Sequence, residues 1–112
     1  NNVTHSLARW TISKSLMTAM TSLRTGWATN RWLNEVFEMT NSIRTAYNKI
    51  PTPILMLQSE VDHHVVNPTL AKLCFKWTNC TLKPIPNSKH EILQESDPAR
   101  NEAMNAILDF TR

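Results

Sequence analysis

The sequence predicts an α/β fold, in which a helical first part is followed by a strand, a helix, a second strand and a final helix. Pro51 and Pro53 divide the 112-residue chain, and the spacing of apolar residues changes there from helix-like to strand-like. The two strand-like runs are separated by one helix-like segment, an order typical of a parallel pair with a right-handed crossover. We therefore expect residues 1–50 to form a helical cap or lid, and residues 51–112 to form the βαβα part of a larger sheet.

The first 50 residues contain two expected helices. Residues 4–23 have a sparse apolar stripe and little strand character, which predicts one helix, either continuous or broken. Gly26 can end that helix, because glycine adopts a positive φ without strain. Asn30 is expected to cap the second helix. The apolar positions of this second helix follow a 3.6-residue period and are Trp32, Leu33, Val36, Phe37, Ile43 and Tyr47.

The second half contains two candidate strands. Ile54–Leu57 is a continuous apolar run, as expected for a parallel strand that is buried on both faces. Thr81–Ile85 is the other, and Pro84 within it indicates an edge position. The expected helices begin at Asn67 and Asp97, where a capping residue precedes a proline. Because two strands do not make a stable open sheet, we expect the remaining strands to come from an upstream segment or from another chain.

Composition and charge exclude several classes of protein. The hydrophobic content of 41% and charged content of 19% are ordinary for a globular chain, and no apolar run approaches the roughly 18 residues of a membrane span. The net charge of +3 is spread along the chain rather than clustered, so nucleic acid is not an expected partner. A weak attraction to anionic membrane surfaces stays open. The N-terminus has neither an initiator methionine nor a signal peptide, so we expect the chain to be a part of something longer.

Glycine and cysteine usage adds two expectations. Gly26 is the only glycine, so a Gly-x-Ser-x-Gly turn, which presents the nucleophile of many serine hydrolases, does not occur in this sequence. Cys74 and Cys80 lack Cys-x-x-Cys spacing. A disulfide between them is conceivable, but we expect reduced, partly buried thiols.

Asp62 and His90 are the candidate catalytic residues. Asp62 lies in the loop after the first strand, and His90 lies in the loop after the second. Alone, Asp62 could make a local turn and His90 could be a surface residue. Together, in this order and at consecutive strand ends, they are typical of the acid and the general base of a Ser-His-Asp triad. Glu60, two residues before Asp62, is the rival carboxylate.

Several other residues are candidates for binding a metal or a substrate. His63 and His64 are adjacent, and no third ligand follows at zinc-like spacing, so no metal is expected. His5 is interpreted as a residue at the start of a helix, with Thr4 or Ser6 as the cap. Five large side chains of the expected cap could line a groove for an acyl chain or could equally be packing residues. They are Trp10, Met17, Met20, Trp27 and Trp32.

The sequence resembles the C-terminal portion of the bacterial lysophospholipase L2 family, in the monoacylglycerol-lipase-like branch of the α/β-hydrolases. The most specific matching text is His90-Glu-Ile-Leu followed by Glu95 and Asp97. Further matching text is Thr52–Gln58, Asp62 with Val65-Val66-Asn67, Cys74, Arg100, Ala106–Phe110 and, in the cap, Val3–Ser6, Gly26, Thr29 and Arg31-Trp32.

The resemblance implies a fold, a reaction and a location. It implies that the chain is the C-terminal part of an α/β-hydrolase, with its cap region, and that His90 is the triad base and Asp62 the triad acid. The implied reaction is hydrolysis of a fatty acyl ester of a lysophospholipid, without cofactor or metal, and it needs the upstream half of the same hydrolase for the serine. This chain alone is expected to be inactive. The implied location is the cytoplasmic side of a bacterial inner membrane, with peripheral membrane contact.

Two alternative functions are also compatible with the sequence. One is a monoacylglycerol lipase or another carboxylic-ester hydrolase that uses the same triad. The other is a non-catalytic helical interaction module that has kept hydrolase-like segments.

Overall fold

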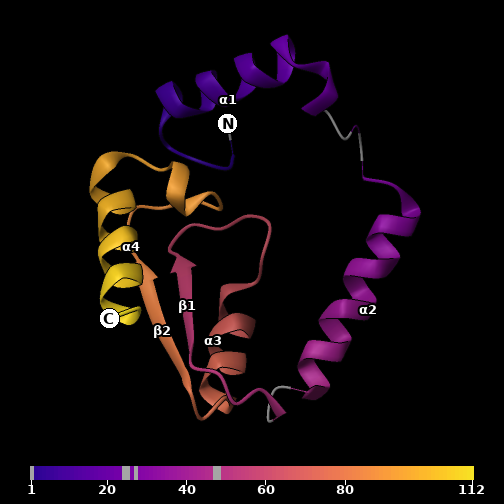
Figure 1. Ribbon diagram of the computed structural model, residues 1–112, viewed down its shortest axis with the longest axis vertical. Helices are drawn as coiled ribbons and strands as arrows, with labels where there is room; N and C mark the ends of the chain where they lie inside the picture. The colour runs from indigo at the N-terminus through magenta and orange to yellow at the C-terminus, as the bar shows by residue number, and fades with distance from the viewer. Residues whose placement is uncertain (1, 24–25, 27, 47–48) are drawn as a thin grey trace.

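The computed structural model describes residues 2–23, 26, 28–46 and 49–112 (Figure 1). The order of elements is two helices followed by strand, helix, strand and helix, as the sequence predicts. The elements are α1 (Leu7–Ala19), the short 3₁₀ turn η1 (Thr21–Leu23), α2 (Asn30–Ala46), β1 (Ile54–Ser59), α3 (Asn67–Lys76), β2 (Cys80–Ile85), the 3₁₀ turn η3 (Ile92–Gln94) and α4 (Asp97–Phe110).

The two strands form a parallel pair. Their register runs from Ile54 opposite Cys80 to Ser59 opposite Ile85, so both carboxyl ends lie at the same edge. The prediction of a βαβα unit is therefore confirmed for residues 54–110. Since β1 and β2 both end at this edge, the loops that follow them lie close together.

The core lies between the strand pair and α4. Ile85 at the end of β2 packs with Ala99 and Ala103 of α4, and Leu57 and Ile92 complete the cluster. The small alanine side chains let α4 approach β2 closely, and Figure 1 shows α4 running alongside that strand. This packing fixes the position of the segment 86–96, which connects β2 to α4.

The two N-terminal helices are much more exposed. Among their described side chains, neither α1 nor α2 has a buried residue. Leu16 is 52% exposed, and Trp32 and Phe37 are 55% and 65% exposed. Figure 1 shows the two helices arching around the strand pair and α4, and an ion pair between Arg9 and Asp97 joins α1 to the start of α4. Within the described ranges, no helix has the length and apolar character needed to cross a membrane.

Two expected helix caps are shifted by one position or replaced. Asn30 is the first residue of α2, and the cap is Thr29, whose hydroxyl accepts a hydrogen bond from the N–H of Trp32 at 3.1 Å. Asn67 does not cap α3, because its side-chain amide donates to the carbonyl of Ser59 at 2.7 Å. Asn67 thereby holds the end of β1 against the start of α3, and Pro68 still occupies the first turn of the helix.

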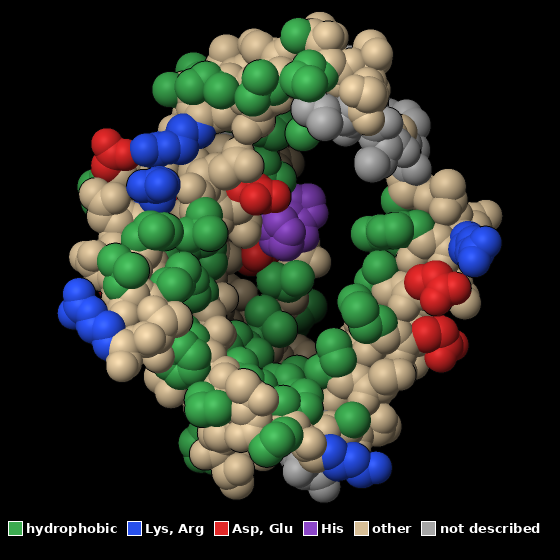
Figure 2. Space-filling model, viewed as in Figure 1, with side chains coloured by type: hydrophobic (Ala, Val, Ile, Leu, Met, Phe, Trp, Pro, Cys, Tyr) green, Lys and Arg blue, Asp and Glu red, His purple; other side chains and the backbone are tan. Residues whose placement is uncertain are grey.

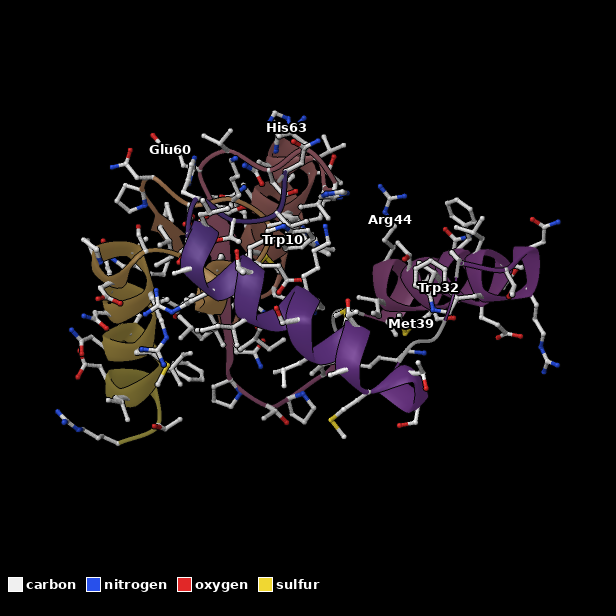
Figure 3. The ribbon with its side chains drawn as sticks, turned by 90° about the horizontal axis from the view of Figure 1, so that it is seen from above. Trp10, Trp32, Met39, Arg44, Glu60 and His63 are labelled. Atoms are coloured by element: carbon white, nitrogen blue, oxygen red, sulfur yellow. A yellow bond between two sulfur atoms is a disulfide. The ribbon has the colours of Figure 1, made fainter. Side chains whose placement is uncertain are left out.

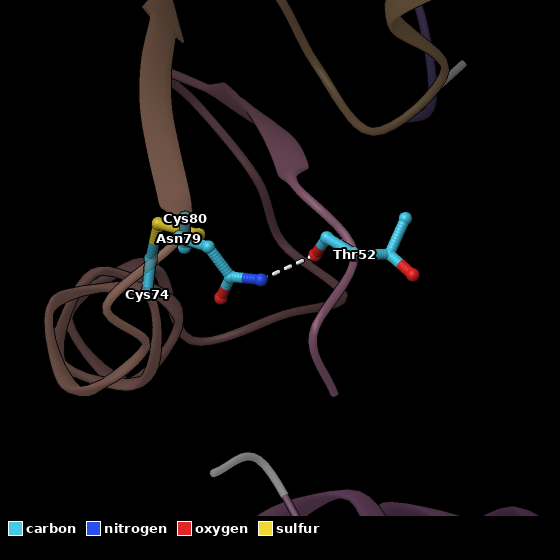
Figure 4. Close-up of a disulfide and its surroundings, with 4 residues drawn as sticks. All are labelled: Thr52, Cys74, Asn79 and Cys80. Atoms are coloured by element: carbon cyan, nitrogen blue, oxygen red, sulfur yellow. Dashed lines mark hydrogen bonds between the residues drawn. A yellow bond between two sulfur atoms is a disulfide. The ribbon is translucent and has the colours of Figure 1, made fainter. Parts of the chain in front are cut away.

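The expectation of reduced cysteines is wrong. Cys74 and Cys80 form a disulfide, with their Cα atoms 5.3 Å apart (Figure 4). Cys74 lies in the last turn of α3, and the chain turns back over three residues so that Cys80 begins β2. In the same turn, the amide of Asn79 donates to the carbonyls of Ile50, at 3.1 Å, and of Thr52. The disulfide and Asn79 together attach the turn to the segment that leads into β1.

Candidate active site

Asp62 lies in the loop directly after β1, and its side chain is only 4% exposed. Four groups surround its two carboxylate oxygens. The hydroxyl of Ser59 donates to Oδ2 at 3.0 Å, and the N–H groups of His64 and Val65 donate to Oδ1 at 2.7 and 3.1 Å. The fourth group is the ring of His90. Groups of the protein itself therefore fix the orientation of the Asp62 carboxylate, without any contribution from a substrate.

These contacts keep Asp62 ionised. Burial alone raises the pKa of the carboxyl, but the hydrogen bonds from His64, from His90, from Val65 and from Ser59 outweigh it and lower the pKa to about 2. At neutral pH, Asp62 is thus a fixed negative charge next to the imidazole of His90.

His90 contacts Asp62 through one ring nitrogen. Its Nδ1 lies 3.0 Å from Oδ2 and 3.3 Å from Oδ1, and the side chain is 38% exposed. An ionised carboxylate can only accept a hydrogen bond, so in the neutral ring the proton must be on Nδ1. That tautomer leaves Nε2 as the basic nitrogen, which is the state that a general base needs.

The two histidine rings of the site lie against each other. The ring centroids of His64 and His90 are 4.9 Å apart, with a tilt of 57° between the planes. Figure 2 shows histidine side chains next to carboxylates at the rim of a hollow that is lined mainly by hydrophobic side chains. The site therefore faces an apolar, open region rather than the packed core.

Backbone contacts join the loop of Asp62 to the loop of His90. The N–H of Val61 donates to the carbonyl of Ser88 at 2.9 Å, and the buried hydroxyl of Ser88 donates to the carbonyl of Ile85 at 2.6 Å. Asn87 has a φ of 51°, and its N–H donates to the carboxylate of Glu60 at 2.7 Å. The structure thus brings Asp62 to His90, whereas the carboxylate of Glu60 contacts the neighbouring backbone.

Of the five candidate groove residues, the structure describes Trp10, Met17, Met20 and Trp32. Trp10 of α1 lines a surface pocket with Leu7, Thr11 and Lys14. Figure 3 shows Trp10 and Trp32 on separate helices, far from each other. Met17 and Met20 are about half exposed, at 52% and 49%. Trp27 lies outside the described residues, so the role of this set in binding stays a prediction.

Within the described ranges, no group of three His, Cys, Asp or Glu residues is arranged to hold an ion. His63 is exposed on the loop after β1, next to His64 (Figure 3).

Three polar residues of this region were missed from the sequence. They are Ser59, whose hydroxyl binds the carboxylate of Asp62, Ser88, whose hydroxyl binds the carbonyl of Ile85, and Glu95, which is buried beside the loop of His90. The sequence carries a signal only for Ser59, which lies two residues after the apolar run Ile54–Leu57, at a strand end. In the sequence, Glu95 is notable only as part of the segment that resembles the lysophospholipase L2 family.

The parallel strand pair and the Asp62–His90 pair at its carboxyl edge are features of an α/β-hydrolase. The chain belongs to that class: residues 3–97 match the family model described as serine aminopeptidase, S33. Among individual proteins, it is similar to the probable lysophospholipase L2 of Haemophilus influenzae, with 32% identity over 89 residues. The matched region covers 80% of this chain and 28% of the relative, so the match spans less than a third of that protein's length.

Proposed function

We propose that this chain is the cap and acid–base part of a serine hydrolase that cleaves fatty acyl esters of lysophospholipids. In this proposal, residues 1–50 are the cap and residues 51–112 belong to the catalytic core. The observation that carries it is the 3.0 Å contact between Nδ1 of His90 and Oδ2 of Asp62, formed by loops from two neighbouring strand ends. The similarity to a probable lysophospholipase L2 supports the choice of substrate class.

The nucleophile is proposed to lie outside these 112 residues. A Gly-x-Ser-x-Gly turn needs two glycines, and Gly26 is the only one in this sequence. The serine and the oxyanion donors would then come from the part of the hydrolase that carries that turn. By this reasoning, the 112 residues alone have no route to an acyl-enzyme.

His90 is proposed to transfer the proton in both halves of the reaction. Its Nε2 takes the proton of the serine hydroxyl while the serine oxygen attacks the ester carbonyl. The resulting imidazolium, stabilised by the adjacent Asp62, gives that proton to the leaving glycerol oxygen, and the acyl-enzyme remains. Water then attacks the acyl carbon with His90 again as base, which releases the fatty acid and restores the serine. No metal or cofactor takes part in these steps.

The setting of the reaction is also part of the proposal. Exposed apolar side chains on α1 and α2, such as Met17 and Phe37, are suited to meet a fatty acyl chain. With a net charge of +3, the chain would be attracted weakly to anionic lipid, in keeping with a peripheral position on the cytoplasmic face of a bacterial inner membrane.

Hydrolysis assays on the full-length gene product test the proposal. We expect release of fatty acid from a lysophospholipid in micelles, and loss of this activity in the His90→Ala variant with the fold retained. Equal or faster turnover of a monoacylglycerol would favour the broader carboxylic-ester hydrolase. No turnover of either ester, together with folding of the 112 residues alone, would favour the interaction module.

A further inference from the structure

Glu95 is a fully buried carboxylate, 0% exposed, that lies just before α4. Three backbone N–H groups donate to its oxygens: that of His5 at 2.9 and 3.0 Å, that of Lys89 at 2.9 Å and that of Ser96 at 3.1 Å. Nδ1 of His5 also lies 3.1 Å from Oε1. A buried charge is tolerated only with such a set of donors, so the arrangement is a specific one.

The donors come from segments that are far apart in the sequence. We call residues 3–6 the N-terminal arm. The carbonyl of Val3 accepts a hydrogen bond from the N–H of Glu91 at 2.7 Å, and the buried hydroxyl of Thr4 donates to the carbonyl of Gln94 at 2.8 Å. The arm thus lies across residues 89–95. Glu95 binds the arm through the N–H of His5 and the loop of His90 through the N–H of Lys89.

The loop held in this way is the one that carries His90. Lys89, whose N–H is bound by Glu95, directly precedes His90. Asp62, in the loop after β1, binds the ring of His90. One carboxylate therefore orients the imidazole, and another holds the backbone from which the imidazole extends.

We propose that Glu95 is a positioning residue, which fixes the backbone of His90 through the Lys89 N–H and ties it to the N-terminal arm. This inference rests on the proposed function in one respect, namely that His90 is the general base. Neutralising Glu95 would leave buried N–H groups without full partners, and the loop would shift to reach water. A displacement of about 1 Å in a catalytic group can reduce the rate about 100-fold.

The test uses the Glu95→Gln variant of the full-length gene product. Glutamine keeps the shape but replaces one acceptor by a donor that faces N–H groups. We expect kcat to fall by about 10- to 100-fold while KM stays close to its wild-type value. We also expect the amides of Lys89 and His5 to lose protection from hydrogen exchange, and the Nδ1–H signal of His90 in proton NMR to broaden or disappear.

Two further variants make the test specific. Glu91→Gln makes the same change in charge on an exposed side chain of the same loop, and it should match the wild type in all three measurements. Thr4→Val keeps Glu95 but removes the hydrogen bond from the arm to Gln94 and the one that the Thr4 hydroxyl accepts from the N–H of Ser6, and it should lower kcat in the same direction by a smaller factor. If Glu95→Gln does not fold, Thr4→Val still tests whether the arm helps to position His90.

The proposal is overturned if Glu95→Gln loses amide protection at His5 and Lys89 while the His90 signal and kcat stay at wild-type values. Glu95 would then anchor only the arm. If Glu95→Gln does not fold, wild-type kcat and an unchanged His90 signal in Thr4→Val overturn the part of the proposal that ties the position of His90 to the N-terminal arm. If the wild type hydrolyses no ester, the proposed function fails, and the NMR signal of His90 alone still decides whether Glu95 positions the ring.

Discussion

At the scale of single residues, the geometry of His90 depends on two carboxylates, one that binds its ring and one that binds the backbone of its loop. Asp62 binds the ring at Nδ1, and the peptide N–H of the preceding Lys89 is bound by the buried carboxylate of Glu95. Both carboxylates keep their charge against the cost of burial. For Glu95, burial raises the pKa, but the hydrogen bonds from Lys89, His5 and Ser96 hold it below its usual value.

Replacing Asp62 tests the proposed role of the ring contact. In the full-length gene product, Asp62→Asn should lower kcat by a factor on the order of 10³ to 10⁴, because an amide allows the wrong tautomer of His90. Steady-state hydrolysis of a lysophospholipid measures this. The matched control is Glu60→Gln, since Glu60 binds the N–H of Asn87. A larger loss in Glu60→Gln than in Asp62→Asn would contradict the assignment.

The pKa of Asp62 predicts a pH dependence of stability. Its folded-state pKa of about 2 lies below the ordinary value of 3.8, so ionised Asp62 stabilises the fold above about pH 4 and this contribution is lost as pH falls towards 2. The shift corresponds to about 2 kcal/mol. Urea unfolding at a series of pH values should therefore show the wild-type advantage over Asp62→Asn shrinking as the pH falls from about 5 to about 2. An advantage that is constant over this range would contradict the pKa shift.

Residue types and order were enough to predict the contact between Asp62 and His90, but not the roles of their neighbours. Glu60 stayed a rival to Asp62 in the sequence, because nothing local shows that its side chain turns toward the backbone of Asn87. Glu95 was missed as a partner of His5, because that contact joins residues 90 positions apart.

At the scale of elements, the helices and strands could be predicted because apolar periodicity and prolines mark them. The strand pair, α3 and α4 begin within a residue or two of their expected starts. What the sequence could not reveal was tertiary detail at their ends. Asn67 is of a residue type that often caps helices, but its side-chain amide donates instead to a carbonyl at the neighbouring end of β1, at 2.7 Å. The disulfide was missed because a spacing of six residues becomes close only once α3 ends and the chain reverses.

The disulfide should stabilise the connection between α3 and β2. For a loop with a sequence separation of 6, restriction of the unfolded chain contributes about 2 kcal/mol. In the full-length gene product, we expect the paired variant Cys74→Ser/Cys80→Ser to have a free energy of unfolding in urea that is lower by that amount. A variant with unchanged stability would show that the link contributes nothing to the fold.

Alkylation of the protein in freshly lysed cells tests whether the disulfide between Cys74 and Cys80 exists in the cell. The structure predicts that Cys74 and Cys80 react with iodoacetamide only after reduction. Disulfides persist in oxidising compartments and are rare in the cytosol. Free thiols in native cells would agree with the proposed cytoplasmic location and would contradict the disulfide as the resident state.

At the scale of the whole molecule, the 112 residues are more extended than a compact domain. The radius of gyration is 16.0 Å, against about 13 Å for a compact chain of this length. The difference lies in α1 and α2, whose described side chains are not buried. Their apolar residues therefore have surface left to cover, which is the state expected of a cap that meets other parts of a hydrolase or its lipid substrate.

A peptide of these 112 residues should consequently unfold without a sharp transition. Its buried apolar cluster consists of Ile85, Ala99 and Ala103 with two partly buried neighbours, which is little for a chain of this size. A urea titration followed by circular dichroism should be broad, whereas the full-length gene product should show a cooperative transition. A single steep transition in the peptide would contradict this view of the molecule.

The central claim is that His90 activates a serine that lies outside these 112 residues. Labelling of the full-length gene product with a fluorophosphonate, followed by peptide mass spectrometry, tests it most directly. We predict one adduct, on a serine within a Gly-x-Ser-x-Gly sequence beyond this chain, with a labelling rate at least about 100-fold lower in His90→Ala. An adduct on a serine within residues 1–112, or an equal labelling rate in wild type and His90→Ala, would contradict it.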